Sequence, residues 1–136
     1  MPTVQVFNSF KEAVAEKVHN LGADTLRVML SNTAPSLSNT QRSNITEIAA
    51  GNGYTAGGAT ATVTTSAQSG GTYSLALAQV VFTASGGSIG PFRYIVLYND
   101  TATNDELIGF LDYGTSYTLS SGASFTIAAG TWLTNA

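Results

Sequence analysis

Residues 92–98 read FRYIVLY, the most hydrophobic segment of the chain, and residues 107–113 read LIGFLDY. β-branched and aromatic residues favour extended strands. We therefore expect the first segment to form the central strand of a sheet and the second to be its neighbour, joined by a polar loop over residues 99–105. Arg93 and Asp112 would then face each other as a cross-strand ion pair, which is a structural role and not a catalytic one.

Short apolar segments separated by glycine-rich turns continue this pattern through most of the chain. Further strands are expected at residues 25–30, 60–65, 73–77, 80–84, 117–119 and 125–128. No helices alternate with these strands, which disfavours a parallel α/β fold. The sequence predicts a mainly β fold, an antiparallel β-sandwich or barrel with one N-terminal α-helix and a long irregular arm.

The single helix is expected over residues 9–22. Ser9 and Glu12 have the spacing of a capping box, and Gly22 stands where a left-handed C-cap would end the helix. Apolar residues recur at helical spacing along one narrow stripe, namely Phe10, Val14, Val18 and Leu21. This stripe predicts that the helix lies on a sheet or on a neighbouring subunit.

The arm is expected over residues 32–60, where Asn, Ser, Thr, Ala and Gly dominate. Irregular segments of this length in compact domains tend to be functional or to dock on something. We expect the arm to be extended and to be the leading contact element, with Ile45 and Ile48 as its main apolar anchors and Tyr54 as a further contact residue.

Aromatic residues supply the other candidate contacts with a partner or a second subunit. Phe92, Tyr94 and Tyr98 have the same parity on the expected central strand and would share one face. Such a row could bind a sugar, pack a core or form a subunit contact, and the apolar strand favours the last two. Trp132 could anchor the C-terminal segment on a neighbour.

Composition limits the class of protein. A chain of 136 residues corresponds to one domain, residues 1–136. Only 10% of the residues are charged, against about 25% in a typical soluble domain. This fits a component of a larger particle and equally a secreted β-domain whose surface consists of Ser, Thr, Asn and Gln. The five basic residues are scattered and the net charge is −3, so nucleic-acid binding is not expected. No apolar run approaches the roughly 18 residues of a membrane span, and residues 1–14 do not resemble a signal peptide.

Residues suited to catalysis are few. His19 is the only histidine and there is no cysteine, so neither a metal site nor a cofactor is expected. Ser88 lies in a Gly-x-Ser-x-Gly pattern at residues 86–90, but a strand-like segment follows it and His19 precedes it, which is the wrong order for a nucleophile elbow. Asp105 and Glu106 fit solvated loop acids better than a glycosidase pair. The sequence predicts that the protein is not an enzyme.

Five segments resemble a family of small virion structural proteins of tailed bacteriophages and prophages. The resemblance covers nearly the whole chain in order, apart from the last stretch AAGTWLTNA. It is carried by residues 7–36 (FNSFKEAVAEKVHNLGADTLRVMLSNTAPS), 45–58 (ITEIAAGNGYTAGG), 82–101 (FTASGGSIGPFRYIVLYNDT), 107–114 (LIGFLDYG) and 120–127 (SSGASFTI). These motifs are structural and not catalytic.

The resemblance implies a protein made in the host cytoplasm and built into the particle. Its leading implication is a capsid decoration, or cement, protein that binds the lattice of the major capsid protein on the capsid exterior and stabilises the head. Such proteins are homo-oligomers, with a trimer favoured. The alternative is a tail, baseplate or fibre component with a receptor- or glycan-binding role. No nucleic-acid or membrane partner is expected.

Overall fold

The structure, a computed structural model, describes residues 4–135. The chain is mainly β, with 50% strand and 8% helix, and its sheets are antiparallel. The elements in chain order are β1 (Gln5–Val6), α1 (Asn8–Ala15), β2 (Leu26–Ser31), a 3-10 turn (Arg42–Asn44), β3 (Ala59–Ala61), β4 (Val63–Ser69), β5 (Thr72–Leu77), β6 (Val80–Thr83), β7 (Ile89–Asn99), β8 (Leu107–Leu119), β9 (Ser124–Ile127) and β10 (Gly130–Asn135). The predicted mainly β fold with one N-terminal helix is confirmed.

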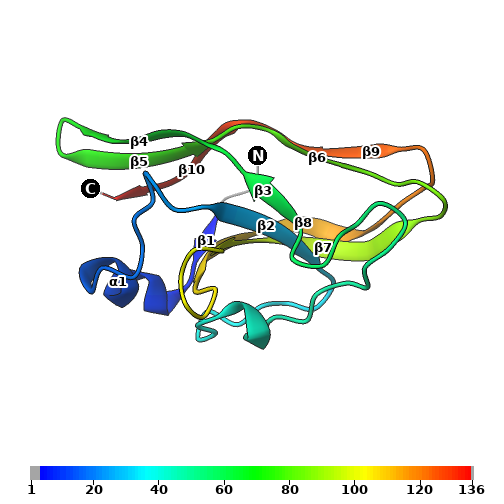
Figure 1. Ribbon diagram of the computed structural model, residues 1–136, viewed down its shortest axis with the longest axis horizontal. Coiled ribbons are helices and arrows are strands. Elements are labelled where there is room, and N and C mark those ends of the chain that lie inside the picture. The colour runs from blue at the N-terminus through cyan, green and yellow to red at the C-terminus, as the bar shows by residue number, and fades with distance from the viewer. Residues whose placement is uncertain (1–3, 136) are drawn as a thin grey trace.

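The strands form two layers (Figure 1). The lower sheet has the order β1-β8-β7-β2-β3, and the upper layer consists of β10-β5-β4 and β6-β9. Within the upper layer Gly130 pairs with Leu77 and Ile127 pairs with Val80, so the register runs through from one small sheet to the other. The upper layer is therefore one long antiparallel ribbon, interrupted in its middle, with β4 added at one end.

One side of this sandwich is closed by the chain itself. The strand predicted at residues 60–65 is in fact two strands, because the chain crosses between layers at Thr62. Ala61 pairs with Leu26 in the lower sheet, whereas Val63 pairs with Leu77 in the upper layer. On the opposite side no strand within residues 4–135 joins the layers, so the fold is an open sandwich and not a closed barrel.

Apolar side chains cover both faces of the lower sheet. Ile95 and Leu97 of β7 point into the main core between the two layers, where they meet upper-layer residues such as Leu75. Val96 and Tyr98, which alternate with them, belong to a second cluster on the far face with Phe7, Met29, Tyr94, Leu107 and Phe110. A strand buried on both faces needs cover on both sides.

The predicted aromatic row on one face of β7 is wrong. Phe92 lies in the main core, whereas Tyr94 and Tyr98 lie in the second cluster on the other face. The reason is a β-bulge, since the register between β7 and β8 shifts between Phe92 and Tyr94. Residues 113–116 of β8 lie opposite Arg93 alone, and an irregularity of this kind turns the following side chains of a strand to the opposite face.

The arm is irregular as predicted, but it is not extended away from the domain. Figure 1 shows it running beneath the lower sheet, and Ile45 packs against the second cluster there. Where β3 stops pairing with β2, the arm takes its place: Glu47 forms a bridge with Ser31, and the Ile48 N–H donates to the Leu30 carbonyl at 3.1 Å. The backbone groups of this part of the arm therefore pair within the chain.

A half-buried carboxylate holds the arm in this position. Glu47 accepts hydrogen bonds from the Tyr54 hydroxyl at 2.6 Å and from the Gly57 N–H at 2.6 Å, and it pairs with Arg42 at 3.1 Å. The Tyr54 oxygen in turn accepts the Leu30 N–H at 3.0 Å. Burial, reinforced by the bond to Glu47, raises the pKa of Tyr54 above its ordinary range, so this hydroxyl stays protonated and keeps donating.

The predicted helix over residues 9–22 is too long, and its capping box does not form. The helix starts after the buried Phe7 with no side-chain cap. It ends in a Schellman motif, in which Lys17 adopts a left-handed φ of 67° and the Val18 N–H donates to the Ala13 carbonyl at 2.9 Å. This turn, and not Gly22, ends the helix. It directs His19 into the protein.

Two further differences concern the C-terminal third. Residues 117–119, predicted as a separate strand, are the end of β8, and β10 was not predicted. The cross-strand ion pair is confirmed, since Arg93 binds Asp112 through two hydrogen bonds of 2.8 and 3.0 Å. The hydrogen bond from Arg93 lowers the pKa of Asp112 below its ordinary value, which keeps this exposed carboxylate charged.

Replacement of Tyr54 by Phe tests how the arm is held. The substitution removes the hydroxyl between Glu47 and the buried Leu30 N–H and leaves that N–H without a partner. We expect the free energy of unfolding to fall by about 1–3 kcal/mol, measured by denaturant titration. Tyr113→Phe, at a side chain that is 42% exposed, is the control and should change it by less than about 0.5 kcal/mol. Equal stability of the two variants would contradict this account of the arm.

Candidate functional site

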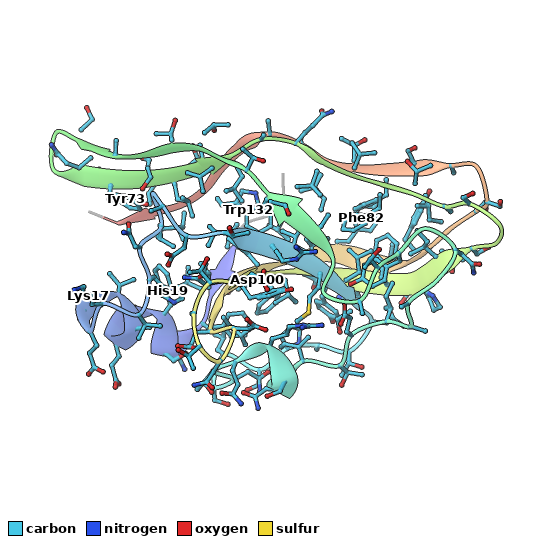
Figure 2. The ribbon with its side chains drawn as sticks, in the orientation of Figure 1. Lys17, His19, Tyr73, Phe82, Asp100 and Trp132 are labelled. Carbon is cyan, nitrogen blue, oxygen red and sulfur yellow. The ribbon has the colours of Figure 1, made fainter. Side chains whose placement is uncertain are left out.

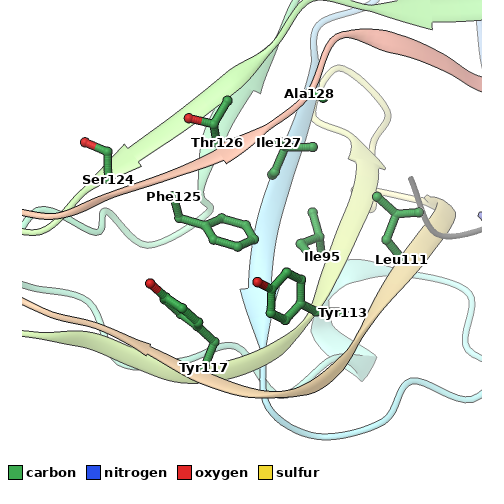
Figure 3. Close-up of a pocket in the computed structure, with 9 residues that line it drawn as sticks. All are labelled: Ile95, Leu111, Tyr113, Tyr117, Ser124, Phe125, Thr126, Ile127 and Ala128. Carbon is green, nitrogen blue, oxygen red and sulfur yellow. The ribbon is translucent and has the colours of Figure 1, made fainter.

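The open side of the sandwich carries a groove with a volume of about 420 Å³. Its floor is apolar, and aromatic side chains from both layers form its walls (Figure 3). The lining residues are Ile95, Leu111, Tyr113, Tyr117, Ser124, Phe125, Thr126, Ile127 and Ala128. We call this feature the aromatic groove. None of its lining residues is charged.

Three aromatic rings give the groove a defined shape. Tyr113 packs edge-on against Phe125, with ring centroids 5.4 Å apart, and against Tyr117 at 5.9 Å. Phe125 also contacts the buried Phe92 edge-on at 5.0 Å. Edge-to-face contacts of this kind stabilise aromatic clusters. The rings are therefore held by the core behind them, while Tyr113 remains 42% exposed.

Strand edges border the groove. β8 pairs with β7 on one side, except over residues 113–116, which bulge out opposite Arg93. On its other side β8 pairs with β1 at Gly109 and Phe110. β9 pairs with β6 alone. In the part of the chain that the structure describes, the outer edges of residues 112–119 and 124–127 thus face no other strand. Unpaired strand edges are templates for pairing with another chain.

A second feature is the distribution of charge. The eight acidic and five basic residues all lie outside two blocks, residues 48–92 and 113–136, which contain none. All five strands of the upper layer fall within these blocks. The upper layer is therefore uncharged, and the charges are confined to the lower sheet, its loops, the arm and the region of α1. The two uncharged blocks are visible in the sequence alone, but the predictions from sequence did not include them.

The exposed face of the upper layer is covered by small hydroxyl and aliphatic side chains. Val81 is 44% exposed and pairs with Thr126 on the neighbouring strand. Next to them, Thr83 and Ser124 share a hydrogen bond of 2.9 Å between their hydroxyls. Figure 2 shows this face at the top of the molecule, well separated from His19 and Lys17 near the helix.

The predicted contact residues lie mostly in the interior. Tyr54, Tyr98 and Trp132 are 2%, 0% and 4% exposed, and Tyr94 is 9% exposed. Their side chains pack within the chain and do not contribute to its surface, because the bulged β7 and the last strand direct them into the two clusters. The predicted arm anchors Ile45 and Ile48, both half-buried, also pack against the chain's own core.

The candidate catalytic residues do not come together. Ser88 lies in the turn before β7, with its carbonyl accepting the Asn52 side chain at 3.0 Å. Asp112 is paired with Arg93, and His19 lies beside the helix. Asp105 lies 3.7 Å from Arg42. Among residues 4–135 no three His, Asp or Glu side chains are grouped so that they could hold a metal ion.

His19 has a buried and unusual environment. It is 8% exposed, and its Nδ1 lies 3.0 Å from the Asn99 amide nitrogen. That amide also donates to Asp24 at 2.7 Å, so Nδ1 accepts and the proton sits on Nε2, which has no hydrogen-bond partner. Burial lowers the pKa of His19, against the opposing influence of the Glu106 and Asp24 carboxylates.

Comparison of the chain with protein-family models, with curated proteins and with solved structures found no match. No helix within residues 4–135 is long and apolar enough to cross a membrane. The resemblance to phage virion proteins therefore stays a prediction from the sequence. The surfaces described above are the structural basis for a functional proposal.

The environment of His19 predicts how stability depends on pH. Unfolded His19 takes up a proton near pH 6.5, whereas the folded protein resists protonation, because Nδ1–H would face the Asn99 donor. The unfolded state thus binds more protons than the folded state. The free energy of unfolding is therefore highest above about pH 6.5 and decreases as the pH falls below that value. We expect the denaturant concentration at the unfolding midpoint to decrease as the pH is lowered from about 7.5 to about 5.5. His19→Gln should remove most of this dependence, and an unchanged pH profile in that variant would contradict the assignment.

Proposed function

We propose that the protein is a structural, non-enzymatic component of a tailed-bacteriophage virion. More narrowly, we propose a capsid decoration protein that binds the lattice of the major capsid protein on the exterior of the head and stabilises it. The resemblance of the sequence supports the phage assignment. The structural observation that carries the proposal is the uncharged upper layer, which makes one side of the domain suited to burial in a large assembly.

The physical argument concerns desolvation. Removing water from a charged side chain costs far more than removing it from a hydroxyl or an aliphatic group, unless the charge finds a partner. The central parts of protein interfaces are accordingly depleted in charged residues. The upper layer offers five strands without a charge. The opposite side, with the arm and the charged loops, would remain in water and keep the particle surface soluble.

A decoration protein does not need tight single contacts. Many copies can bind a closed, symmetric lattice at once. When these copies are linked to one another, the effective affinity of each copy for the lattice rises. A protein that binds the assembled shell, and not its dissociated subunits, also stabilises the assembled state by mass action. A small, rigid, uncharged face fits this role, because binding then costs little ordering of the chain.

The alternative is a tail, baseplate or fibre component that binds a glycan. The observation in its favour is the aromatic groove, where the exposed Tyr113 lies near the hydroxyl-bearing Ser124 and Thr126. Aromatic faces beside polar groups are suited to sugar rings. A glycan array that gives hits with the wild-type chain and none with Tyr113→Ala would support this alternative, and an array without hits would count against it.

The test of the leading proposal is binding to expanded heads that lack the protein, purified from the phage that encodes it. We expect saturable co-sedimentation that is insensitive to salt between about 0.1 M and 1 M, although the Debye length falls from about 10 Å to 3 Å over this range. Val81→Lys places a charge in the middle of the upper layer. It should weaken binding by about tenfold or more, which is the typical scale of a hot-spot residue.

Leu37→Lys is the matched control. Leu37 lies in the arm, where its carbonyl accepts the Asn8 N–H, and its exposed fraction of 39% is close to the 44% of Val81. This variant should bind heads as the wild type does. Absence of wild-type binding, or loss of binding in Leu37→Lys with retention in Val81→Lys, would contradict the proposal.

A further inference from the structure

We propose that His19 is a pH-operated latch between the connector, residues 16–25, which joins α1 to β2, and the end of β7, where Asn99 begins the loop to β8. At neutral pH the uncharged ring fastens the connector to this loop. At mildly acidic pH the charged ring leaves Asn99, so that the connector loosens while the sandwich stays folded. The inference does not depend on the proposed function. It rests on the hydrogen bonds of Asn99 and on the cavities beside His19.

The amide of Asn99 can adopt only one orientation. Its oxygen accepts the N–H groups of Thr101 at 2.9 Å and of Ala102 at 3.2 Å. Its nitrogen donates to the Asp24 carboxylate at 2.7 Å and lies 3.0 Å from His19 Nδ1. A reversed amide would point its oxygen at this carboxylate and its own N–H groups at two further donors. The amide nitrogen therefore faces His19, and Nδ1 has to accept.

His19 fits this place only while it is uncharged. The uncharged imidazole accepts at one nitrogen and donates at the other, whereas the charged ring donates from both. Protonated Nδ1 would stand opposite the N–H of Asn99, with both donors buried, since His19 is 8% exposed and Asn99 is fully buried. Buried donors without an acceptor are costly, and a buried charge without a partner is more so. Protonation therefore breaks this contact.

Few other hydrogen bonds hold the connector. The Thr25 N–H donates to the Thr101 hydroxyl at 2.8 Å, and the Asp100 N–H donates to the Thr25 carbonyl at 2.9 Å. Both bonds lie at the C-terminal end of the connector, directly before β2. Within residues 4–135, the bond between His19 and Asn99 is the one hydrogen bond that ties residues 16–23 to the sheets or to the loop after β7. Its loss would free most of the connector.

Two cavities beside His19 give the ring room to move. One, of about 430 Å³, lies between α1 and the upper layer, and there the ring packs against Phe10 with centroids 5.3 Å apart. The other, of about 370 Å³, is lined by His19 together with Asp24, Lys17 and Thr101. Because Lys17 and Thr101 are exposed, this second cavity is open to water. A charged ring that turns into it gains water and the Asp24 carboxylate.

The charges around His19 favour the open position once the ring is protonated. Glu106, directly before β8, and Asp24 of the connector both attract a charged ring. Lys17 at the end of α1 lines the second cavity and opposes it. The upper layer faces His19 across the larger cavity through residues such as Tyr73 and contributes no charge. Burial lowers the pKa of His19 in the closed position, so the proton is taken up mainly by the open form.

Nuclear magnetic resonance of the purified chain tests the latch, because His19 is the only histidine and its ring signals need no assignment. Between about pH 7.5 and pH 5.5 we expect the Nε2–H tautomer to give way to the charged ring. Amide exchange of residues 18–24 and 100–102, corrected for its intrinsic pH dependence, should rise by about tenfold or more. Residues 94–98 of β7 should keep their protection. A ring that stays neutral until the whole domain unfolds, or that titrates without faster exchange, would overturn the proposal.

Two variants assign the change to His19. His19→Gln offers an oxygen to Asn99 and does not titrate, so exchange of the connector should no longer respond to pH. Glu106→Gln keeps an oxygen for the Asn104 N–H and leaves the bonds of Asn99 intact, so it serves if His19→Gln fails to fold. It removes a charge that attracts the protonated ring and should lower the pH at which the connector opens. Opening of either variant at the wild-type pH would overturn the proposal.

Discussion

The burial of β7 on both of its faces is the constraint on which the rest of the structure depends. From Tyr94 to Asn99 every residue of this strand is buried, so the sheet around it needs apolar cover above and below. The uncharged ribbon provides the upper cover. The arm, through Ile45, and Phe7 just before α1 provide the lower one, and this is why a segment with the composition of a flexible loop lies flat against the sheet. Glu47 and Tyr54 make that arrangement stable, since they satisfy backbone groups that would otherwise be buried without partners.

The strongest sequence signals predicted the centre of the fold and failed at its margins. β7, β8 and the ion pair between Arg93 and Asp112 follow from composition and alternation alone. The bulge after Phe92 could not be predicted, because a local shift of register leaves no mark in the apolar pattern yet reverses the faces of the later side chains. The helix end was missed because Lys17 takes a left-handed conformation that sequence rules assign to glycine. Aromatic residues were predicted as contacts because sequence alone does not separate a core tyrosine from a surface one.

The proposed function is inferred from the surfaces of the domain that carry no charge. The chain supplies few groups for catalysis, and the structure keeps His19, Ser88 and Asp112 in separate surroundings. Its distinctive features are surfaces: an uncharged layer of five strands and an open side with aromatic rings between unpaired edges. The first is suited to burial against a large partner. In the proposed function the uncharged layer faces the capsid lattice, and the arm and the charged loops face water.

A reconstruction of the phage particle that resolves individual strands is the most direct measurement of the central claim. The account predicts that the chain lies on the outside of the head, with β6 and β9 facing the capsid lattice and the arm facing solvent. A position in the tail, or an orientation with the arm and the charged loops against the shell and the upper layer exposed, would contradict it.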